Sequence, residues 1–369
     1  MKLITKLLLV AFLATSFMAT AQDEEESEGP ELSISGSVDA YYRANLNSAN
    51  DGSGSAPGSS FANQNGFALG MANVIIGLDG EKTGFVADFV YGPRGSDAVF
   101  NSPQSSTSQS SNIVNQLYAY WNVSDAVTLT MGNFNTFLGY EVISPSANFN
   151  YSTSYMFSYG PFSHTGLKMD ISASDDLSFM LALLNPTDFT EFNPTGNYSI
   201  GAQVGYKGVY LNLLYGDQTG DLDALDELFQ VDLTAGFDLS DAFYLGLNAT
   251  YQITQVDDSV DPAFADADGP GFYGAAAYLQ YSISDAFALG TRVEYFSEQG
   301  QYGAIGPVFD ADGKANVIDI TLTGQYKVGD LTVIPEIRFD AASEDQFTDA
   351  DGEASSGLAS FVLAAVYTF

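Results

Sequence analysis

The strongest constraint on the fold is an alternation of residue types that runs to the last residue of the chain. The final stretch reads GLASFVLAAVYTF, and counting back by twos from Phe369 places Tyr367 and Phe361 on one face of a strand. The intervening positions, such as Thr368, lie on the other face. Terminal residues of soluble proteins are usually polar and frayed. We therefore expect something to cover this apolar face along its whole length.

The same alternation recurs from Leu32 to Phe369, with almost no helical periodicity between the runs. Seven short turns, several of them built on Ser-Asp and one on Gly-Asp, alternate with eight longer polar stretches. The long stretches lie near 46–65, 93–112, 136–162, 186–196, 217–227, 256–271, 299–313 and 343–356. This arrangement predicts sixteen strands of about 9–13 residues, a length that suits a tilted crossing of a membrane.

The fold class expected from this pattern is all-β: a transmembrane, antiparallel, up-and-down β-barrel with short periplasmic turns and long extracellular loops. Its first and last strands would pair, because unpaired backbone groups are not tolerated in lipid. Lipid would then cover the apolar face that ends at Phe369. A soluble β-sandwich and a β-propeller are the alternatives. The Ser-Asp turns recur at roughly the spacing of propeller blades, about 40–50 residues, but a propeller does not explain the terminal aromatic residue.

Composition agrees with a barrel and excludes several classes of function. Aromatic residues make up 14% of the chain, and no later segment has the run of about 18 apolar residues that a spanning helix needs. The 46 acidic and 11 basic residues give a net charge of −35, which excludes nucleic acid because phosphate binding needs clustered Lys and Arg. The chain has no cysteine and no dinucleotide, P-loop or zinc motif, so no cofactor is expected.

The first 21 residues have the features of a signal peptide. Lys2 and Lys6 precede the apolar core LLLVAFLATSFMA, and ATA before Gln22 is typical of a cleavage site. Residues 22–31 are expected to form an acidic periplasmic stub, and residues 32–369 the barrel. The expected location is the Gram-negative outer membrane, with lipid, lipopolysaccharide and the barrel-assembly machinery as partners. Phe369 resembles the terminal aromatic signal that this machinery reads.

Alternation also assigns each charged residue of the strands to a face. A charge on the lipid face would cost about 2–4 kcal/mol at the midplane, whereas sixteen strands leave an aqueous channel inside. The basic residues are scarce and would set the field of a constriction against nearby carboxylates; the alternative for each charge is wall solvation or a cross-strand pair. The predicted pore-lining or constriction residues are Arg43, Glu141, Lys168, Asp170, Asp232, Arg292, Glu294, Asp319, Glu336 and Arg338, with Asp39, Asp88 and Asp340 on the same face.

The stretch 136–162 differs from the other long loops. It reads TFLGYEVISPSANFNYSTSYMFSYGPF, which is rich in aromatic residues and carries Glu141 as its only charge. An exposed loop of this composition would be prone to aggregate unless it packed against something. We interpret it as a candidate constriction loop that folds into the pore. Packing across the barrel top, or against a neighbouring subunit, is the alternative.

A family resemblance is carried by GSVDAYY, LYAYW, GYE and NYSTSYMFSYGPFSHTGLK, and it is densest over residues 117–170. These motifs resemble the OmpL-like β-barrel porin family of Bacteroidota, which implies an outer-membrane porin. Trimer formation is an expectation from porins generally. Where an Asp- and Trp-rich stretch is expected, this chain reads VISPSANF. The matching positions are Gly139, Tyr140, Glu141, Asn150, Tyr151, Ser152, Tyr159, Pro161, His164, Thr165 and Gly166.

The single histidine and the acidic loops are candidates for two other kinds of site. The single histidine, His164, lacks the Ser or Asp partner pattern of a barrel enzyme, and we expect it to be structural rather than catalytic. Three acidic loops repeat Asp-Ala-Asp-Gly and could hold calcium weakly at Asp310 and Asp312, Asp349 and Asp351, or Asp266 and Asp268. Phe or Val stands where a calcium loop places its first ligand, so a flexible acidic turn is the alternative.

The sequence thus predicts an outer-membrane porin for passive diffusion of ions and small hydrophilic solutes. The acidic external loops should concentrate cations at the entrance and repel anions, and more so at low salt. The alternative is a surface-binding or adhesion barrel whose lumen is plugged by the aromatic loop.

Overall fold

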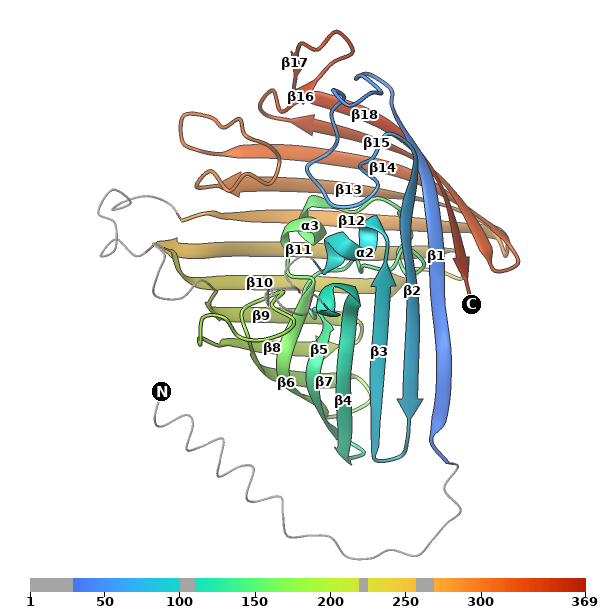
Figure 1. Ribbon diagram of the computed structural model, residues 1–369, viewed down its shortest axis with the longest axis vertical. Coiled ribbons are helices and arrows are strands. Elements are labelled where there is room, and N and C mark those ends of the chain that lie inside the picture. The colour runs from blue at the N-terminus through green and yellow to red at the C-terminus, as the bar shows by residue number, and fades with distance from the viewer. Residues whose placement is uncertain (1–28, 100–109, 219–224, 257–268) are drawn as a thin grey trace, which may run out of the picture. The chain divides into compact units, whose positions relative to one another are not determined.

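The computed structural model describes residues 29–99, 110–218, 225–256 and 269–369. The predicted signal peptide and most of the predicted stub lie outside these residues. Residues 31–369 form one compact unit, a closed barrel of sixteen antiparallel strands (Figure 1). This confirms the predicted fold class and number of strands. Within the described ranges, no helix is long and apolar enough to cross a membrane.

Each barrel strand pairs with its neighbours in the chain, apart from the closing pair. The strands are β1 Glu31–Asn45, β2 Gly66–Asp79, β3 Thr83–Tyr91, β4 Val114–Ser124, β5 Val127–Asn135, β6 Ser163–Ser172, β7 Leu177–Leu184, β8 Ser199–Tyr206, β9 Val209–Asp217, β10 Leu225–Asp238, β11 Phe243–Val256, β12 Gly271–Ser284, β13 Phe287–Gln299, β14 Ala315–Val328, β15 Leu331–Ala342 and β18 Gly357–Thr368.

The remaining elements lie in the long connections. The connection between β3 and β4 contains helix α2 (Pro93–Ala98) and the 3-10 turn η1 (Ser110–Ile113), and the one between β5 and β6 contains α3 (Tyr155–Tyr159). Strands β16 (Phe347–Thr348) and β17 (Ala354–Ser355) form a separate small hairpin in the connection between β15 and β18. We call the end of the barrel that carries the long connections the loop end, and the opposite end the turn end.

Serine side chains shape several of the short turns, as the repeated Ser-Asp pattern predicts. The Ser240 hydroxyl oxygen accepts the N–H groups of Ala242 and Phe243 at 3.3 and 3.2 Å. Ser174 and Ser284 accept N–H groups in the same way in their own turns. These local bonds replace backbone partners that the strands no longer provide, and so end one strand and start the next.

The first and last strands close the barrel. In the register of β1 and β18, Ser37 lies opposite Thr368, and the N–H and C=O of Gly36 exchange hydrogen bonds with Phe369 at 3.0 and 3.1 Å. A Cβ on Gly36 would lie 2.8 Å from the Phe369 ring, so the glycine makes room for that ring. The ladder therefore runs to the final residue and leaves no free edge between these strands.

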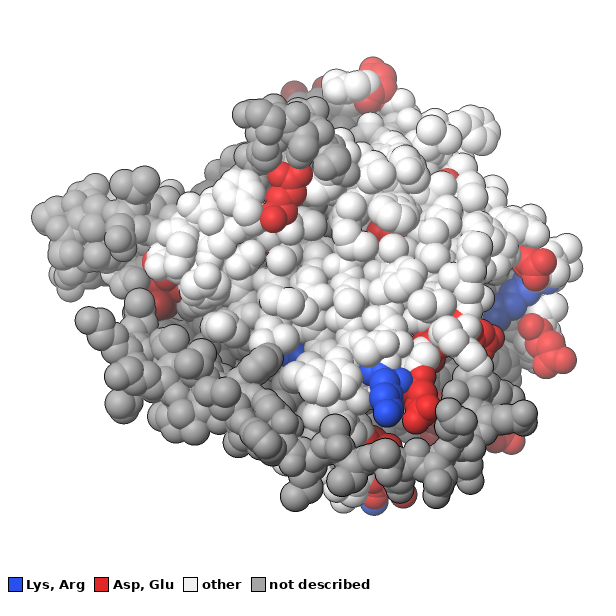
Figure 2. Space-filling view, turned by 60° about the horizontal axis from the view of Figure 1, so that its bottom comes forward, with Lys and Arg blue, Asp and Glu red and all other residues white. Residues whose placement is uncertain are grey.

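The two faces of each strand differ as the alternation predicts. On β18, Leu363 and Tyr367 are 42% and 46% exposed, whereas Ala364 and Val366 between them are buried. Similar exposed apolar side chains recur around the barrel. Figure 2 shows a face dominated by uncharged side chains, with most of the visible charges toward its margins. Such a surface suits contact with lipid.

Candidate functional site: a loop seated on the charged inner wall

The connection 136–162, called here the inner loop, crosses the lumen from β5 to the opposite wall and returns to β6 (Figure 1). Near its start, the N–H of Gly139 donates to Asp232 of β10 at 2.9 Å. In its middle, the N–H of Tyr151 donates to Glu336 of β15 at 2.8 Å. The loop therefore packs against inward-facing side chains of distant strands, inside the barrel and not over its top.

Carboxylates of the wall hold the loop by its backbone. Glu336 accepts the N–H groups of Tyr151 and Ser152 at 2.8 and 3.1 Å. Glu294 of β13 accepts both N–H groups that open α3, those of Tyr155 and Met156, at 2.8 Å. These N–H groups have no partner within the helix, and a carboxylate is favourable at a helix N-terminus. The wall thus supplies the charge that the aromatic loop lacks.

Two buried arginines join the loop to the wall. Arg292 lies 2.8 Å from Glu141 of the loop and 2.7 Å from Asp319 of β14, and it also donates to the carbonyl oxygen of Ser152 at 2.7 Å. Arg338 lies 3.0 Å from Asp319 and 2.7 Å from Asp340, and it donates to the carbonyl oxygen of Thr153. Because Asp319 contacts both guanidinium groups, loop and wall share one buried ion network, and removal of one partner would leave charges uncompensated.

Glycines of the inner wall make room for large side chains of the loop. At each of these glycines, an added Cβ would lie closer than 3.0 Å to a loop side chain, where real Cβ atoms essentially never lie. Glycines on four strands therefore leave room for these loop side chains and help to fix the position of the loop. The pairs are Gly201 of β8 with Phe137 at 2.7 Å, Gly246 of β11 with Tyr140 at 2.3 Å, Gly274 of β12 with Met156 at 2.8 Å, and Gly290 of β13 with Phe149 at 2.3 Å.

Arg94 of α2 holds the inner loop from the loop end of the barrel. Its Nε and Nη1 donate to the carbonyl oxygens of Ile143 and Tyr151 at 2.9 and 3.1 Å, and its guanidinium lies 4.4 Å from the centre of the Phe61 ring. Arg94 lies in a stretch that the sequence indicates only as a polar loop, so the sequence pattern does not predict its role. The scarcity of basic residues, used to single out four others, could have drawn attention to it.

A partly buried aspartate fixes the point where the loop rejoins the barrel. Asp188, between β7 and β8, accepts the N–H groups of Phe162 and Ser163 at 2.8 and 2.9 Å. Burial raises the pKa of the Asp188 carboxyl to about 6, and the two N–H donors offset part of that rise.

Most of the predicted pore-lining residues are buried in the structure. Eight of them are at most 4% exposed, so in this conformation they do not face open water. These eight are Arg43, Glu141, Asp232, Arg292, Glu294, Asp319, Glu336 and Arg338. Most of them contact the loop or one another instead. Lys168 and Asp170 differ, since they pair at 2.9 Å with side chains 26% and 41% exposed. Contacts with the loop or with one another take the place of open water for most of the eight, and a pore-lining role for these residues stays a prediction.

The residues of the family motif gather at the same place. Gly139 has a φ of 86°, a conformation that favours glycine, where the loop turns onto Asp232. The Asn150 amide donates to Thr323 at 2.7 Å, and the Tyr151 hydroxyl donates to Asp39. Asn133 accepts the Thr165 hydroxyl at 2.9 Å, and a Cβ on Gly166 would lie 2.3 Å from the Leu183 carbonyl oxygen. His164 is buried, with Nε2 2.9 Å from the Thr136 hydroxyl and its ring against Phe137.

The acidic loops form tight turns. Asp310 accepts the N–H groups of Asp312 and Lys314 at 2.9 Å, and Asp349 accepts those of Asp351 and Glu353 in the same way. In the part of the chain that the structure describes, no group of three or more acidic, His or Cys side chains is arranged to hold a metal ion. The third predicted pair, Asp266 and Asp268, lies outside the described residues.

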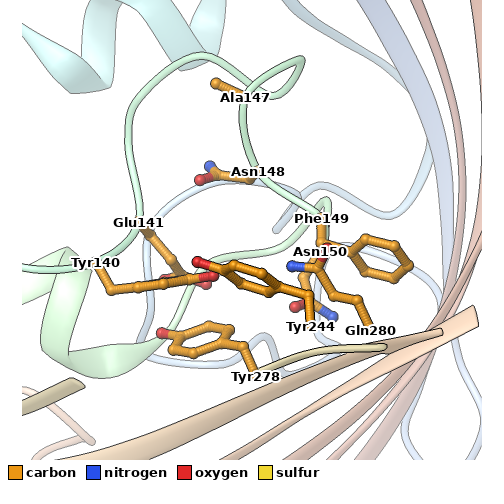
Figure 3. Close-up of a pocket in the computed structure, with 9 residues that line it drawn as sticks. All are labelled: Tyr140, Glu141, Ala147, Asn148, Phe149, Asn150, Tyr244, Tyr278 and Gln280. Carbon is orange, nitrogen blue, oxygen red and sulfur yellow. The ribbon is translucent and has the colours of Figure 1, made fainter. Parts of the chain in front are cut away.

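A string of cavities borders the inner loop along β10 to β13. The loop-end cavity, about 580 Å³, is lined by Asp188, Gln252 and Tyr302 among others. Between the loop and the wall of β10 and β11 lies a neck of only about 10 Å³. Toward the turn end lie a cavity at Gly208 of about 330 Å³, the tyrosine cavity of about 250 Å³ shown in Figure 3, and a turn-end cavity of about 440 Å³ beside Lys327.

A closed sixteen-stranded barrel with a loop seated in its lumen has the architecture of an outer-membrane porin. The chain belongs to the family described as "Putative beta-barrel porin-2, OmpL-like", whose family model matches residues 31–369. The family resemblance seen in the motifs is thereby confirmed, and the family indicates an outer-membrane porin channel.

Several solved porin-type structures are similar in fold. They include an anion-selective porin from Comamonas acidovorans (TM-score 0.59, 10% identity, 92% of this chain and 100% of that one). The outer-membrane channel DcaP of Acinetobacter baumannii has a TM-score of 0.56 and 14% identity over 95% and 100% of the two chains. OmpT of Vibrio cholerae, in a trimer form, has a TM-score of 0.53 and 8% identity over 93% and 100%. At these identities the likeness shows the fold alone. No curated protein matches the chain.

Proposed function

We propose that the protein is a passive diffusion channel for ions and small hydrophilic solutes, in which the inner loop constricts the lumen. The observation that carries this proposal is the fixed seating of the loop: wall carboxylates bind its backbone N–H groups, and Arg292 and Arg338 bind its carbonyl oxygens. A loop held at so many points would act as a rigid narrowing of an aqueous channel. Selection would then depend on pore width and electric field, with no chemical step.

We further propose that the channel prefers cations. The porin of Comamonas acidovorans is anion-selective and has a similar fold, so the fold does not determine the sign of the preference. Support comes from this chain's own charge of −35 and from exposed carboxylates of its long connections, including Asp310, Asp312 and Asp351. A negative entrance concentrates cations and repels anions.

The test is to reconstitute the folded protein in a planar bilayer and to record current under a potassium chloride gradient. Stepwise conductance with a cation-signed reversal potential is the expected result. Conductance with an anion-signed reversal would keep the channel and overturn the cation preference. Lys168, whose side chain is 26% exposed, would then be the first basic residue to replace.

A second candidate function is a plugged barrel that binds ligands at the cell surface. The observation in its favour is the neck, where the space between loop and wall falls to about 10 Å³, roughly the room that one water molecule needs. A protein that is folded in the bilayer but electrically silent would support this function against the first.

Export and assembly complete the proposal. Residues 1–21 would direct export, residues 22–31 would remain as a periplasmic stub, and Phe369 would serve as a signal for the barrel-assembly machinery in a membrane containing lipopolysaccharide. A homotrimer is proposed because OmpT of Vibrio cholerae, which is similar in fold, has been solved in a trimer form. Weak calcium binding at the acidic turns stays a hypothesis, to be checked by titrating the folded protein with calcium.

A further inference from the structure

The cavities beside the inner loop lie next to one another in a series, because neighbouring cavities share lining residues. The loop-end cavity and the neck share Gly160, Pro161 and Gln230, and the neck shares Gly139 with the cavity at Gly208. Tyr140 and Tyr244 line both that cavity and the tyrosine cavity, which shares Phe149 and Gln280 with the turn-end cavity. In Figure 3, Tyr140 enters the tyrosine cavity from the loop and faces Tyr244 and Tyr278 of the wall.

The order of this series follows the strands from one end of the barrel to the other. Along β10, the lining residues pass from Gln230 at the loop-end cavity to Asp232 at the neck and Thr234 at the cavity below it. Along β11, they pass from Gln252 to Thr250 and then to Tyr244. The series therefore descends through the lumen between the inner loop and the wall of β10 to β13.

The neck is the narrowest part of the series, and its two sides differ in chemistry. Side chains of the wall, which are Gln230, Asp232, Asn248 and Thr250, form the polar side. The loop contributes a mostly apolar side that includes Leu138, Phe157 and Pro161. An ion that passes here could replace its bound water molecules only with oxygen and amide groups of the wall.

Asp232 carries the charge of this polar side. Its carboxylate accepts the N–H of Gly139, the Asn212 amide at 2.9 Å and the Asn248 amide at 2.7 Å, all of them neutral donors. Among the described residues it makes no ion pair, in contrast to Asp319, which lies within 3.0 Å of Arg292 and Arg338. Its negative charge is thus not cancelled by a neighbouring cation, whereas the carboxylate at the tyrosine cavity, Glu141, is paired with Arg292.

We propose that the permeation path follows this series of cavities, and that Asp232 at the neck is the carboxylate that selects small monovalent cations. The proposal rests on the proposed channel function and goes beyond it by assigning the route and the residue. Arg292 and Arg338 of the buried ion network line none of the five cavities and would position the loop without touching the passing ion.

The natural absence of cysteine allows a direct test of the route. We would compare single-cysteine variants Thr250→Cys at the neck and Ser360→Cys on β18, where the side chain is buried at 2% exposure and borders none of the five cavities. The probe is silver ion in chloride-free nitrate solution, a monovalent cation that forms an S–Ag bond with a thiol and releases its proton. Channels of the cysteine-free parent provide the baseline.

The expected result is that silver ion reduces the current of Thr250→Cys channels and leaves Ser360→Cys channels unchanged. Adding Asp232→Asn to Thr250→Cys should slow the reaction by about tenfold, because the local concentration of cations at the neck falls. Asp88→Asn is the matched control for this charge. Asp88 is buried on β3, is bound by the neutral amides of Asn73 and Asn115, and borders none of the five cavities.

The outcomes separate this inference from the proposed function. Conducting channels in which Thr250→Cys is inert, or in which Ser360→Cys reacts as fast, would overturn the route. If Thr250→Cys failed to fold, Asp232→Asn alone would decide the assignment of the residue. It should reduce the ratio of potassium to chloride permeability by at least about twofold, while Asp88→Asn leaves it unchanged. An equal ratio in both variants would overturn the assignment. A folded parent protein without conductance would overturn the channel function and this inference together.

Discussion

Arg292 shows at the scale of one residue how the inner loop and the wall depend on each other. Its guanidinium is 0% exposed and lies within 2.8 Å of Glu141 and 2.7 Å of Asp319. Replacing it in Arg292→Met keeps much of the volume but leaves both carboxylates buried without this partner. We expect the free energy of unfolding to fall by about 3–5 kcal/mol, measured by urea titration of the protein folded in lipid.

A solvent-exposed ion pair provides the control for this substitution. Lys207 lies 3.4 Å from Asp176, with side chains 57% and 55% exposed. Water already solvates both groups, so Lys207→Met should change the free energy of unfolding by no more than about 0.5 kcal/mol. An equal fall in the free energy of unfolding of the two variants would mean that the buried network does not hold the loop.

The inner loop is positioned by glycines of the wall, which lack side chains, as much as by charges. Gly290 of β13 faces the Phe149 ring, and a Cβ there would lie 2.3 Å from it. Gly290→Ala should therefore displace this part of the loop at a cost of about 1–3 kcal/mol. Limited proteolysis should then cut within residues 136–162 faster than in the parent.

The matching control is a glycine whose added Cβ meets only ordinary contacts. Gly324 of β14 would place a Cβ 3.4 Å from Pro335, at normal van der Waals distance. Gly324→Ala should leave both stability and the rate of cleavage in the inner loop close to those of the parent. Faster cleavage in both variants would point to general loosening of the barrel and not to displacement of the loop.

At the scale of the whole molecule, two sources of cation preference respond differently to salt. The exposed carboxylates of the long connections act through water and are screened over about 10 Å at 0.1 M salt and about 3 Å at 1 M salt. The buried charge of Asp232 is screened much less. We expect the preference to weaken as salt rises and to level off above zero. Reversal potentials measured at a fixed concentration ratio over a range of salt would show this, and a loss of all preference at 1 M would argue against the role of Asp232.

Closure of the barrel at Phe369 leads to a prediction about assembly in the cell. Phe369 pairs with Gly36 through two backbone hydrogen bonds and is 55% exposed toward the outside. Deleting it should lower the amount of folded barrel in the outer membrane, because the proposed signal for the assembly machinery is lost, and should alter refolding in detergent less. Phe339→Ala, which removes another outward aromatic ring, is the control. Equal amounts of folded barrel for the Phe369 deletion and for Phe339→Ala in cells would contradict the role of Phe369 as a signal.

Much of the fold follows from features that are local in sequence. The period of two fixed which side chains face lipid and which face inward, and the Ser-Asp turns marked where strands end. Membrane residence then required a closed barrel, because lipid offers no partner for a free strand edge. Strand number and the inward placement of Asp232, Arg292 and Glu336 could be predicted on these grounds.

The candidate site could be predicted only in part. The aromatic composition of residues 136–162 indicated that the loop must pack somewhere, but left its place open. Nothing local in the sequence linked Gly246 to Tyr140, or Arg94 to the carbonyl oxygen of Ile143, because these contacts join residues far apart in the chain. Alternation predicts the face of the strand on which a side chain lies. Only the tertiary structure shows which residues pack against that side chain. For that reason the sequence alone determined a barrel with an inward-facing charged wall, while the folded loop decided which of those charges anchor it and which border the neck.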